Sequence, residues 1–406
     1  MANSDPADTA PAAMDKSLII ALVAGEASGD NLGAPLIREI KRKHPDARFV
    51  GIGGPAMIAE GLDSWFNMDR LSVNGFIDPI KRLPELLNIL LTIRSRLLAS
   101  PPSCFVGVDF NFFNLLLEGR LKRRGIKTVQ YVSPTVWAWR SGRIRAIARN
   151  VDLMLTLYPF ETTIYEENGI SVKFVGHPKA HEIDLQDGQR NKLEARQLLG
   201  FQTDDRVVAI LPGSRLSEVR YSGPDFFAAA NMVRIAVPEC KFVVAAVNAN
   251  RRHQIGNLLQ VMGLDDIKVV TGQSREVMTA ADVVLVNSGT ATLEAMLLKK
   301  PMVMSYRLGP ATYAIVSRLV KTKFFALPNI LAGHELIPEL IQRAATPEAL
   351  SEAVLAMFNP QIRDNLVTEF DAIHRQLRLN SGNQAAEAIL TLCGEYSQDG
   401  DDNVSP

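Results

Sequence analysis

Short apolar runs recur along the chain, and most are separated by polar stretches with helical periodicity. Five runs in the first half have the pattern of buried strands: 18–24, 48–52, 104–109, 127–132 and 151–157. Five more follow in the second half: 206–211, 241–247, 267–270, 282–286 and 301–305. Alternation of buried strands with amphipathic helices is typical of parallel α/β sheets. Because the pattern restarts, the sequence predicts two doubly wound, Rossmann-like domains in tandem.

Polar segments indicate where these domains end. The stretch GHPKAHEIDLQDGQRNKLEARQLLG (176–200) has no strand character, and the chain beyond about 334 has a helical pattern only. The two ends have the composition of disordered segments. The predicted divisions are a leader (1–16), an N-terminal domain (17–176), a hinge (177–200), a C-terminal domain (201–333), C-terminal helices (334–396) and an acidic tail (397–406).

Composition adds limits to this picture. The 406 residues are 47% apolar, and 44 basic residues balance 44 acidic ones, so bulk charge gives no reason to expect nucleic acid as a partner. The three cysteines form no C-x-x-C motif, which fits a reducing compartment such as the cytoplasm. The N-terminus lacks a signal peptide pattern, and no run reaches the roughly 18 apolar residues of a spanning helix. Any membrane contact is therefore expected to be peripheral.

The first strand leads into a glycine-rich turn, LVAGEASGDNLG (22–33). Such a turn at the start of a helix is where nucleotide-binding folds hold phosphate. Here, however, Glu26 and Asp30 would face a pyrophosphate with like charge. The glycines are also spaced by four and do not follow G-x-G-x-x-G. The turn is therefore a poor dinucleotide site.

A better phosphate site is predicted in the second half. The strand at 282–286 runs into NSGTATLEA, where Ser288, Gly289 and Thr290 form a turn at the start of a helix. Free N–H groups and the positive end of the helix dipole suit a phosphate there, and Glu294 is placed to accept from ribose hydroxyls. The alternative is ordinary helix capping, with Glu294 completing a capping box.

The first strand of the second half also ends in a glycine turn, LPGSRLSEV (211–219). Gly213, Ser214 and Arg215 are expected at the same sheet edge, and the Arg215 guanidinium suits a diphosphate. Gln273, in TGQSRE (271–276), is a candidate for reading uracil. The sequence has no Walker motif and no acidic pair at a strand end, so neither a metal site nor a cofactor is expected.

Several blocks in register resemble one family. They are VAGEASGD (23–30), FVGVDFNFFN (105–114), YVSPTVWAWR (131–140), FVGHP (174–178), LPGSR (211–215), NSGTATLE (287–294) and LPNILAG (327–333). Together they resemble the lipid A disaccharide synthases. The resemblance implies an inverting, metal-independent GT-B glycosyltransferase with two domains facing a cleft. It also implies transfer from UDP-2,3-diacylglucosamine to 2,3-diacylglucosamine 1-phosphate (lipid X), which gives the β-1,6 disaccharide 1-phosphate and UDP.

The same resemblance implies roles for residues of the first half. In a GT-B enzyme this half presents the acceptor, so Glu26, Ser28 and Asp30 are expected to face sugar hydroxyls. The alternative is structural: Asp30 caps the following helix and Glu26 orders the turn.

Asp109, at the end of a strand, is the candidate general base, and Arg215 is the second catalytic candidate. The alternative is that Asp109 or Asn111 caps a helix at 113–124. Family members often carry a second acid where this chain has Phe112, so Asp109 is the one carboxylate of this block. Trp137 and Trp139, which stand beside Arg140, are candidates for packing on a sugar or acyl chain, and burial in the core is the alternative for one of them. His177 is expected to order the hinge, with a catalytic role as the alternative.

Membrane contact is predicted at two stretches. Residues 120–149 contain nine Lys or Arg and no acid, a zone that would attract anionic lipid. Residues 73–98 have the composition of an interfacial helix, with Val73, Phe76, Ile77, Lys81 and Arg82 as contact candidates. The alternative for residues 120–149 is a solvated helix face. The alternative for residues 73–98 is a buried helix packed on the sheet.

The resemblance thus implies an enzyme on the cytoplasmic face of the inner membrane, with UDP-diacylglucosamine and lipid X as substrates, and the apolar and basic stretches add an anionic membrane surface as the expected partner. It leaves open whether the chain forms a homodimer. The competing functions are another UDP-sugar transferase, a sugar-nucleotide epimerase, a two-domain binding protein without chemistry and a non-enzymatic membrane scaffold.

Overall fold

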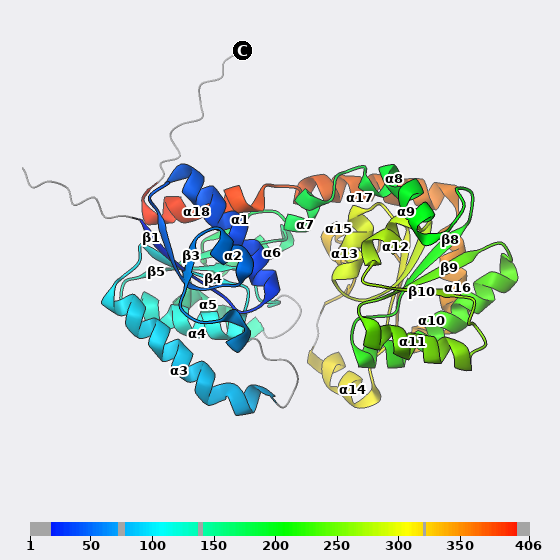
Figure 1. Cartoon of the computed structure of the whole chain (residues 1–406), viewed down its shortest axis with the longest axis horizontal. Coiled ribbons are helices and arrows are strands. Elements are labelled where there is room, and N and C mark those ends of the chain that lie inside the picture. Colours follow the sequence, from blue (N-terminus) through cyan, green and yellow to red (C-terminus); the bar gives the residue numbers. More distant parts are fainter. Residues whose placement is uncertain (1–17, 72–77, 137–140, 320–321, 396–406) are drawn as a thin grey trace, which may run out of the picture. The chain divides into compact units, whose positions relative to one another are not determined.

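A computed structural model describes residues 18–71, 78–136, 141–319 and 322–395 (Figure 1). The chain divides into two compact units. The first holds residues up to Val132, the segment Ile147–Leu155 and the residues from Ala385 on. The second holds Ser133–Ala146 and Thr156–Gln384.

The first sheet has seven strands in the order β3-β2-β1-β4-β5-β6-β7. Their bounds are β1 (Ile19–Ala24), β2 (Arg48–Ile52), β3 (Leu62–Ser64), β4 (Cys104–Val108), β5 (Lys127–Tyr131), β6 (Leu153–Thr156) and β7 (Val172–Phe174). The central strand β1 pairs in parallel with β2 and β4, so that Ile20 lies opposite Phe49 on one side and Cys104 on the other. The loops after β1 and β4 therefore leave the same edge of this sheet.

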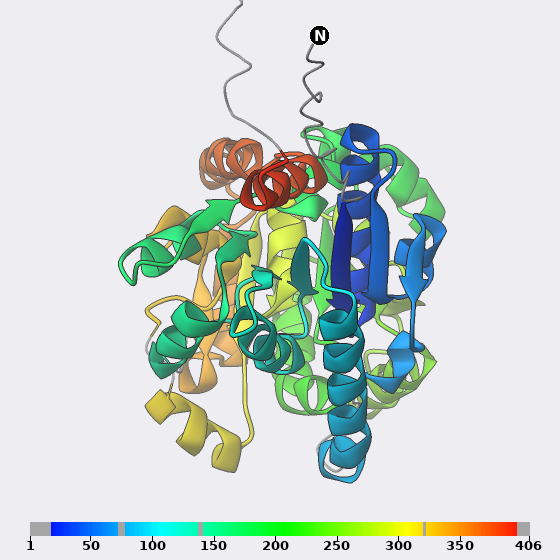
Figure 2. The same cartoon turned by 90° about the vertical axis from the view of Figure 1, so that its left-hand side faces the viewer.

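Helices cover both faces of the sheet because its central strands are apolar on both sides. Ala21 and Val23 of β1 pack with Phe105 of β4 against α3 (Asp78–Ala99) and α4 (Asn111–Lys122), which lie side by side (Figures 1 and 2). The alternate residues Ile20 and Leu22 are also fully buried. Strands buried on both faces are expected in a doubly wound parallel sheet. The other helices that precede β7, together with the last helix of the chain, are α1 (Ala27–Lys43), α2 (Pro55–Ala59), α5 (Ile144–Asn150), α6 (Phe160–Glu166) and α18 (Ser381–Cys393).

The second sheet has six strands in the order β10-β9-β8-β11-β12-β13. Their bounds are β8 (Val207–Leu211), β9 (Lys241–Ala246), β10 (Lys268–Thr271), β11 (Val283–Asn287), β12 (Met302–Tyr306) and β13 (Glu339–Ile341). Strands β8 and β11 are direct neighbours in parallel register, with Leu211 opposite Val286. The turns that follow these two strands therefore emerge together at the carboxyl edge of the sheet.

The other helices of the chain all belong to the second unit. They are α7 (Pro178–Glu182), α8 (Asp187–Arg190), α9 (Lys192–Leu199), α10 (Leu216–Ala236), α11 (Ala249–Val261), α12 (Ser274–Ala280), α13 (Thr290–Leu297), α14 (Pro310–Leu319), α15 (Leu327–Ala332), α16 (Pro347–Ala356) and α17 (Pro360–Leu377). Phe226 and Phe227 of α10 are fully buried in the core that the helices form with the strands.

The ten predicted strands are all present, and the predicted α/β class with two parallel sheets is confirmed. Three strands of three residues each, β3, β7 and β13, were not predicted. β13 corrects the expectation of helices only beyond residue 334. It pairs with β12 through Glu339, Leu340 and Ile341, which are half-buried and too few to produce a periodic signal.

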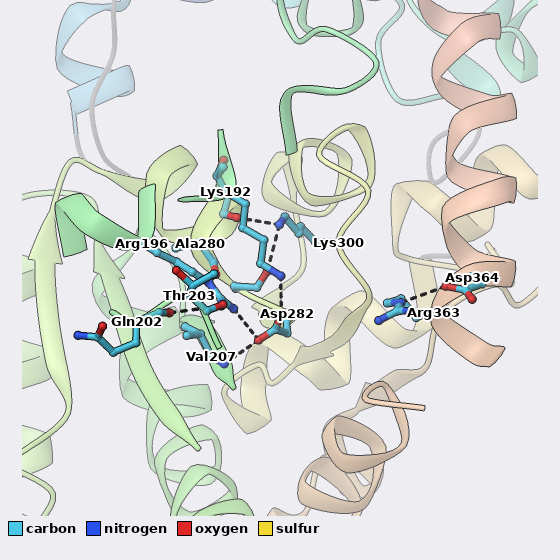
Figure 3. A network of polar contacts seen from close by, with 12 residues as sticks. Lys192, Arg196, Gln202, Thr203, Val207, Ala280, Asp282, Lys300, Arg363 and Asp364 are labelled. Carbon is cyan, nitrogen blue, oxygen red and sulfur yellow. Dashed lines mark hydrogen bonds and ion pairs between the residues drawn. The ribbon is translucent and has the colours of Figure 1, made fainter. Parts of the chain in front are cut away.

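A network of hydrogen bonds and ion pairs lies at the amino edge of the second sheet, where its strands begin (Figure 3). The Asp282 carboxylate accepts from Lys192 Nζ at 2.6 Å, from the Arg196 guanidinium at 2.9 Å and from the Val207 N–H at 2.8 Å. Buried Lys300 donates to the carbonyls of Thr279 (2.7 Å) and Ala281 (3.0 Å). The network links α9 to Val207 at the start of β8 and to Asp282, the residue before β11, at the end of the sheet opposite the carboxyl edge.

Candidate functional site

A cavity of 660 Å³ opens at the carboxyl edge of the second sheet. Its lining comes from the ends of β8, β9 and β11 and from the first residues of α10, α12 and α13. The lining includes six of the residues predicted to bind a nucleotide: Gly213, Ser214, Arg215, Ser288, Gly289 and Thr290. Glu294 lines it too. The structure thus brings together two turns that are more than seventy positions apart in the sequence.

The turn after β8 is ordered by Glu218, which sits in the first turn of α10. Its carboxylate accepts from the N–H groups of Ser214 (2.9 Å) and Arg215 (3.1 Å) and from the Arg215 guanidinium (2.9 Å). Gly213 has φ +118°, and a side chain there would collide with Glu218, so this position requires glycine. Because Glu218 occupies two backbone donors of the turn, a phosphate here would depend mainly on the exposed Arg215 side chain.

The turn after β11 begins at Asn287, which is buried. The Asn287 side chain donates to the Pro212 carbonyl at 3.0 Å and accepts from the Ser288 N–H at 2.8 Å, so it ties the two turns together. α13 starts at Thr290 with Gly289 as its N-cap, and no side chain caps it. The predicted alternative of capping by Ser288 or Thr290 is therefore absent here. The first N–H groups of α13 remain available to an anion.

Glu294 lies one turn into α13 and pairs with Lys179 of α7 at 3.0 Å. The ion pair holds the carboxylate from one side and leaves part of it on the cavity wall. Gln273 is half-buried and precedes α12. The adjacent Gly272 and Ser274 line the cavity, whereas Gln273 is not part of the lining.

The second group of predicted residues lies at the carboxyl edge of the first sheet. Ser28, in the first turn of α1, donates to the Asp109 carboxylate at 2.8 Å. Asp109 has a left-handed backbone with φ +54°, an arrangement that non-glycine residues rarely adopt and that clusters at functional sites. Side chains of Asn114 (3.0 Å) and Gln130 (3.2 Å) donate to the Asp109 carbonyl and hold this conformation.

Asp109 does not cap α4. The N-cap of α4 is Phe110, and it makes no side-chain cap bond. The Asn111 side chain instead accepts from Gln130 at 3.0 Å. The helix-capping alternative for Asp109 and Asn111 is therefore not what the structure shows, and the Asp109 carboxylate remains half-exposed beside Ser28.

The two acids of the first glycine turn have different surroundings. Glu26 is exposed at the N-cap position of α1, without a side-chain cap bond. Asp30 is buried, and its carboxylate accepts from the N–H groups of Gly54, Ala56 and Met57, each at 2.9 Å. Asp30 therefore caps α2, not the helix that contains it. It does not present its carboxylate to a substrate in this structure, which corrects the expectation of a sugar contact.

His177 is the N-cap of α7 and lies buried against Tyr158. Its Nδ1 accepts from the Lys179 N–H at 3.2 Å. Burial, with a smaller effect of the Lys179 charge, lowers the pKa of His177 from 6.5 to about 4. The imidazole is thus neutral near pH 7, and its ordering contact fits the structural role that the sequence predicts.

Sequence comparison decides what kind of protein carries this site. A sequence model of the lipid-A-disaccharide synthetase family matches residues 20–389. The lipid-A-disaccharide synthase of Cellvibrio japonicus (strain Ueda107) is 51% identical over 380 residues, which cover 93% of this chain and 98% of that protein. The chain belongs to the lipid-A-disaccharide synthetase family. The synthase of Pseudomonas savastanoi pv. phaseolicola is also similar, at 48% identity over 95% of this chain and 100% of that protein.

Solved structures with the same fold are more distant. The UDP-GlcNAc 2-epimerase of Neisseria meningitidis bound to UDP-GlcNAc aligns with a TM-score of 0.59 at 13% identity, over 93% of this chain and 100% of that one. A glycosyltransferase of Rickettsia africae ESF-5 aligns with a TM-score of 0.59 at 10% identity, over 93% and 99%. Because both a transferase and an epimerase share this fold, the fold alone does not separate the two functions. The sequence-based family membership favours the synthetase.

Membership of the synthetase family confirms the predicted resemblance, and the two parallel sheets together with the solved neighbours confirm the predicted fold class. Three residues that order the site were not predicted from the sequence: Glu218, Asn287 and Lys179. Glu218 had a usable signal, since Glu three positions after an N-cap is the mark of a capping box. Lys179 had none, because 115 positions separate it from Glu294.

Several expectations fall outside the described residues. Among them are the leader, the tail, Trp137, Trp139, Arg140, Val73, Phe76 and Ile77. Lys81 and Arg82 belong to α3, whose described side chains begin at Leu83. Among the described residues, no helix is long and apolar enough to cross a membrane. Nor does any group of three or more His, Cys, Asp or Glu in those ranges lie close enough together to hold a metal ion.

Proposed function

We propose that this member of the synthetase family transfers the diacylglucosamine unit of UDP-2,3-diacylglucosamine to the 6-hydroxyl of lipid X. The products are the β-1,6-linked tetraacyl disaccharide 1-phosphate and UDP. The observation that carries the proposal is the cavity at the carboxyl edge of the second sheet, where an arginine, a free helix N-terminus and a carboxylate converge. These are groups that bind a nucleoside diphosphate.

In the proposed complex, each part of UDP has a partner in this cavity. The diphosphate lies between the Arg215 guanidinium and the Ser288-Gly289-Thr290 turn, and the ribose hydroxyls donate to Glu294. Lys179, which pairs with Glu294 at 3.0 Å, holds that carboxylate in place. The negative charge that develops on UDP as it leaves is stabilised by Arg215 and by the N-terminus of α13.

The acceptor hydroxyl needs a base, and we assign that role to Asp109. Its carboxylate is half-exposed at the carboxyl edge of the first sheet, and Ser28 orients it at 2.8 Å. The proton leaves the 6-hydroxyl as its oxygen attacks the anomeric carbon, and Asp109 receives it. The exposed Glu26 is the second acid of this edge and is assigned to sugar contacts. Asp30 is left out of the proposed site because three backbone N–H groups already occupy it.

Both lipid substrates reside in membranes, so we also propose peripheral binding to the cytoplasmic face of the inner membrane. The stretch at 73–98 has the apolar and basic composition of an interfacial helix. Its exposed leucines support the proposal: Leu83, Leu87 and Leu91 are 46%, 44% and 54% exposed along α3. Exposed large apolar residues in a row are typical of a contact surface.

Incubation of the purified chain with UDP-2,3-diacylglucosamine and lipid X in detergent micelles tests the proposal. Mass spectrometry should find the tetraacyl disaccharide 1-phosphate. An epimerase would instead change the UDP-sugar without needing lipid X, and a scaffold would leave both substrates unchanged. Absence of the disaccharide from a chain that still binds UDP would reject the transfer.

A further inference from the structure

Four arginines gather in a small cavity of the first unit. Arg94 comes from α3, Arg120 from α4, and Arg123 and Arg124 from the end of α4; together with Leu91 they line a space of 350 Å³. Arg120 donates to the Leu116 carbonyl at 2.8 Å and Arg123 to the Gly119 carbonyl at 2.7 Å, both within their own helix. Neither contact supplies a negative charge.

The part of the chain that the structure describes gives this cluster no counter-charge. Within residues 18–71, 78–136, 141–319 and 322–395, none of the four guanidinium groups forms an ion pair with a carboxylate. Asp152, the carboxylate that pairs with α4, is engaged by Lys122 at 2.8 Å. Four like charges around one cavity repel each other, and an anion bound there would relieve this repulsion. Guanidinium groups bind phosphate oxygens with paired, charge-assisted hydrogen bonds.

An apolar stripe leads into the same cavity along each helix. On α3, Leu83, Leu87 and Leu91 recur every four residues and so share one face, and Leu91 itself lines the cavity. On α4, Phe112 (70% exposed) and Leu116 (39% exposed) precede Arg120 at the same spacing. The two helices pack side by side on one face of the sheet (Figures 1 and 2).

We propose that this arginine cavity binds the phosphate of an anionic phospholipid while the two stripes contact its acyl chains. The inference rests on the membrane docking proposed above, and adds that docking at this cavity prefers anionic phospholipids. A free phosphate would use the arginines but not the stripes. A neutral, zwitterionic surface would use the stripes but offer no net charge to the arginines. The combination of both fits an anionic lipid in a bilayer.

Vesicle flotation of the full chain tests the inference. The test variant carries Arg123→Gln and Arg124→Gln, and the matched control carries Arg251→Gln and Arg252→Gln, an adjacent arginine pair on α11 of the second unit. On phosphatidylcholine vesicles containing phosphatidylglycerol, the test variant should bind roughly thirtyfold more weakly, since each basic residue near an anionic surface contributes roughly fivefold. The control should bind like the unaltered chain. On pure phosphatidylcholine the two variants should not differ.

A Leu83→Ser, Leu87→Ser, Leu91→Ser variant should lose binding to both kinds of vesicle. Calorimetry with inorganic phosphate alone completes the design. Equal binding of the arginine variant and the control to anionic vesicles would overturn the inference. So would tight binding of free phosphate that Arg123→Gln and Arg124→Gln abolish without weakening vesicle binding. Disaccharide synthesis by the unaltered chain in micelles reports on the proposed function separately, because it needs no docked membrane.

Discussion

Asp109 combines two properties that matter for a general base. Its backbone lies in the left-handed region, held there by Asn114 and Gln130, and its carboxylate is oriented by Ser28. The left-handed residue directly follows β4 at the carboxyl edge of the sheet, where functional residues often adopt such backbone angles. A carboxylate fixed in this way can receive a proton without a search over rotamers.

Replacing Asp109 by Asn tests this role with little change of shape. Asn tolerates a positive φ as well as Asp does, so the turn should persist. Loss of the base should lower the turnover of disaccharide synthesis by roughly 10²–10⁴-fold. Affinity for UDP should not change, because the proposed UDP cavity is built from other elements.

The matched control is Asp63→Asn, which removes an exposed acid from β3 of the same unit. It should keep turnover close to that of the unaltered chain. Near-normal turnover in a folded Asp109→Asn protein would remove Asp109 from the mechanism.

Arg215 is the residue on which diphosphate binding should depend most. Its side chain is 77% exposed and pairs with Glu218 of α10, so it can turn toward a ligand. Arg215→Ala removes a charged hydrogen bond worth about 1.5–3 kcal/mol. Affinity for UDP, measured by calorimetry, should therefore fall by about tenfold or more, and turnover should fall with it.

Arg234→Ala is a suitable control for this variant. Arg234 lies near the other end of α10 and is also ion-paired, with Asp266 at 2.9 Å. Its loss should leave UDP affinity unchanged. If Arg215→Ala gave the same affinity and turnover as Arg234→Ala, Arg215 would be an ordinary surface arginine.

At the scale of elements, the short helix α7 links several parts of the second unit. His177 caps its first turn, and Lys179 reaches Glu294 of α13. His374 of α17 holds the other end of α7, because its Nε2 donates to the carbonyls of Ala180 (2.9 Å) and Ile183 (3.1 Å). Lys299 in turn donates to His374 Nδ1 at 2.6 Å. The position of the Glu294 carboxylate therefore depends on how well α7 is held.

The cap of α7 should make stability depend on pH. The pKa of His177 is lowered from 6.5 in the unfolded chain to about 4 in the folded protein. Between these values the unfolded state binds more protons, so acid favours unfolding. The stabilisation is fully present above pH 6.5 and is lost as pH falls through about 4, which corresponds to roughly 3 kcal/mol. The Asn side chain is among the best acceptors for a backbone N–H at an N-cap. His177→Asn should therefore keep the cap of α7 but remove the group that takes up a proton in this pH range.

Urea unfolding at about pH 7.5 and about pH 4.5 measures the effect. The His177→Asn protein should lose less stability on acidification than the unaltered chain. The stability that this variant still loses on acidification should include the contribution of His374. The pKa of His374 is also lowered, chiefly by burial and then by the Lys299 charge. His181→Asn, an exposed position of the same helix, should change nothing. An unaltered acid response in His177→Asn would show that the imidazole is not what titrates.

The elements also show what the sequence could and could not predict. Five-residue strands such as Val207–Leu211 are buried along their whole length, and such runs are visible as apolar stretches. The edge strands Leu62–Ser64, Val172–Phe174 and Glu339–Ile341 are too short for a periodic pattern, and pairing to a neighbouring strand defines them instead.

The same distinction applies to the site. Gly213, Arg215 and the Ser288-Gly289-Thr290 turn could be predicted because each directly follows a strand, and parallel strands end at one edge. The role of Asp30 as the cap of α2 could not be predicted, because the three N–H groups that donate to it lie at the start of a helix about 25 positions later. Contacts between distant segments, such as Lys179 with Glu294, depend on packing that no local pattern records.

At the scale of the whole molecule, the proposed reaction requires lipid substrates to leave a bilayer. The stretch before and along α3 is the proposed docking segment. Val73→Ser, Phe76→Ser and Ile77→Ser together should weaken binding to liposomes, since each lost apolar contact with the bilayer removes about 25 cal/mol per Å². Activity on substrates in vesicles should fall more than activity in micelles, because micelles deliver lipid without a docked orientation.

Ile235→Ser with Val261→Ser is the control for this variant. Both residues are exposed in the second unit, at 74% and 85%. This control should bind liposomes normally. If the triple variant unfolded or aggregated, its three positions would be core residues. If it bound anionic vesicles as before, the basic stretch at 120–149 would be the better docking candidate.

The central claim is that UDP is released only by transfer to lipid X. The direct measurement is the release of UDP in micelles with both lipids, with each lipid alone and with neither, alongside quantification of the disaccharide. We expect UDP only when both lipids are present, in an amount equal to the disaccharide formed. Release of UDP without lipid X, or conversion of the UDP-sugar with no disaccharide, would contradict the account.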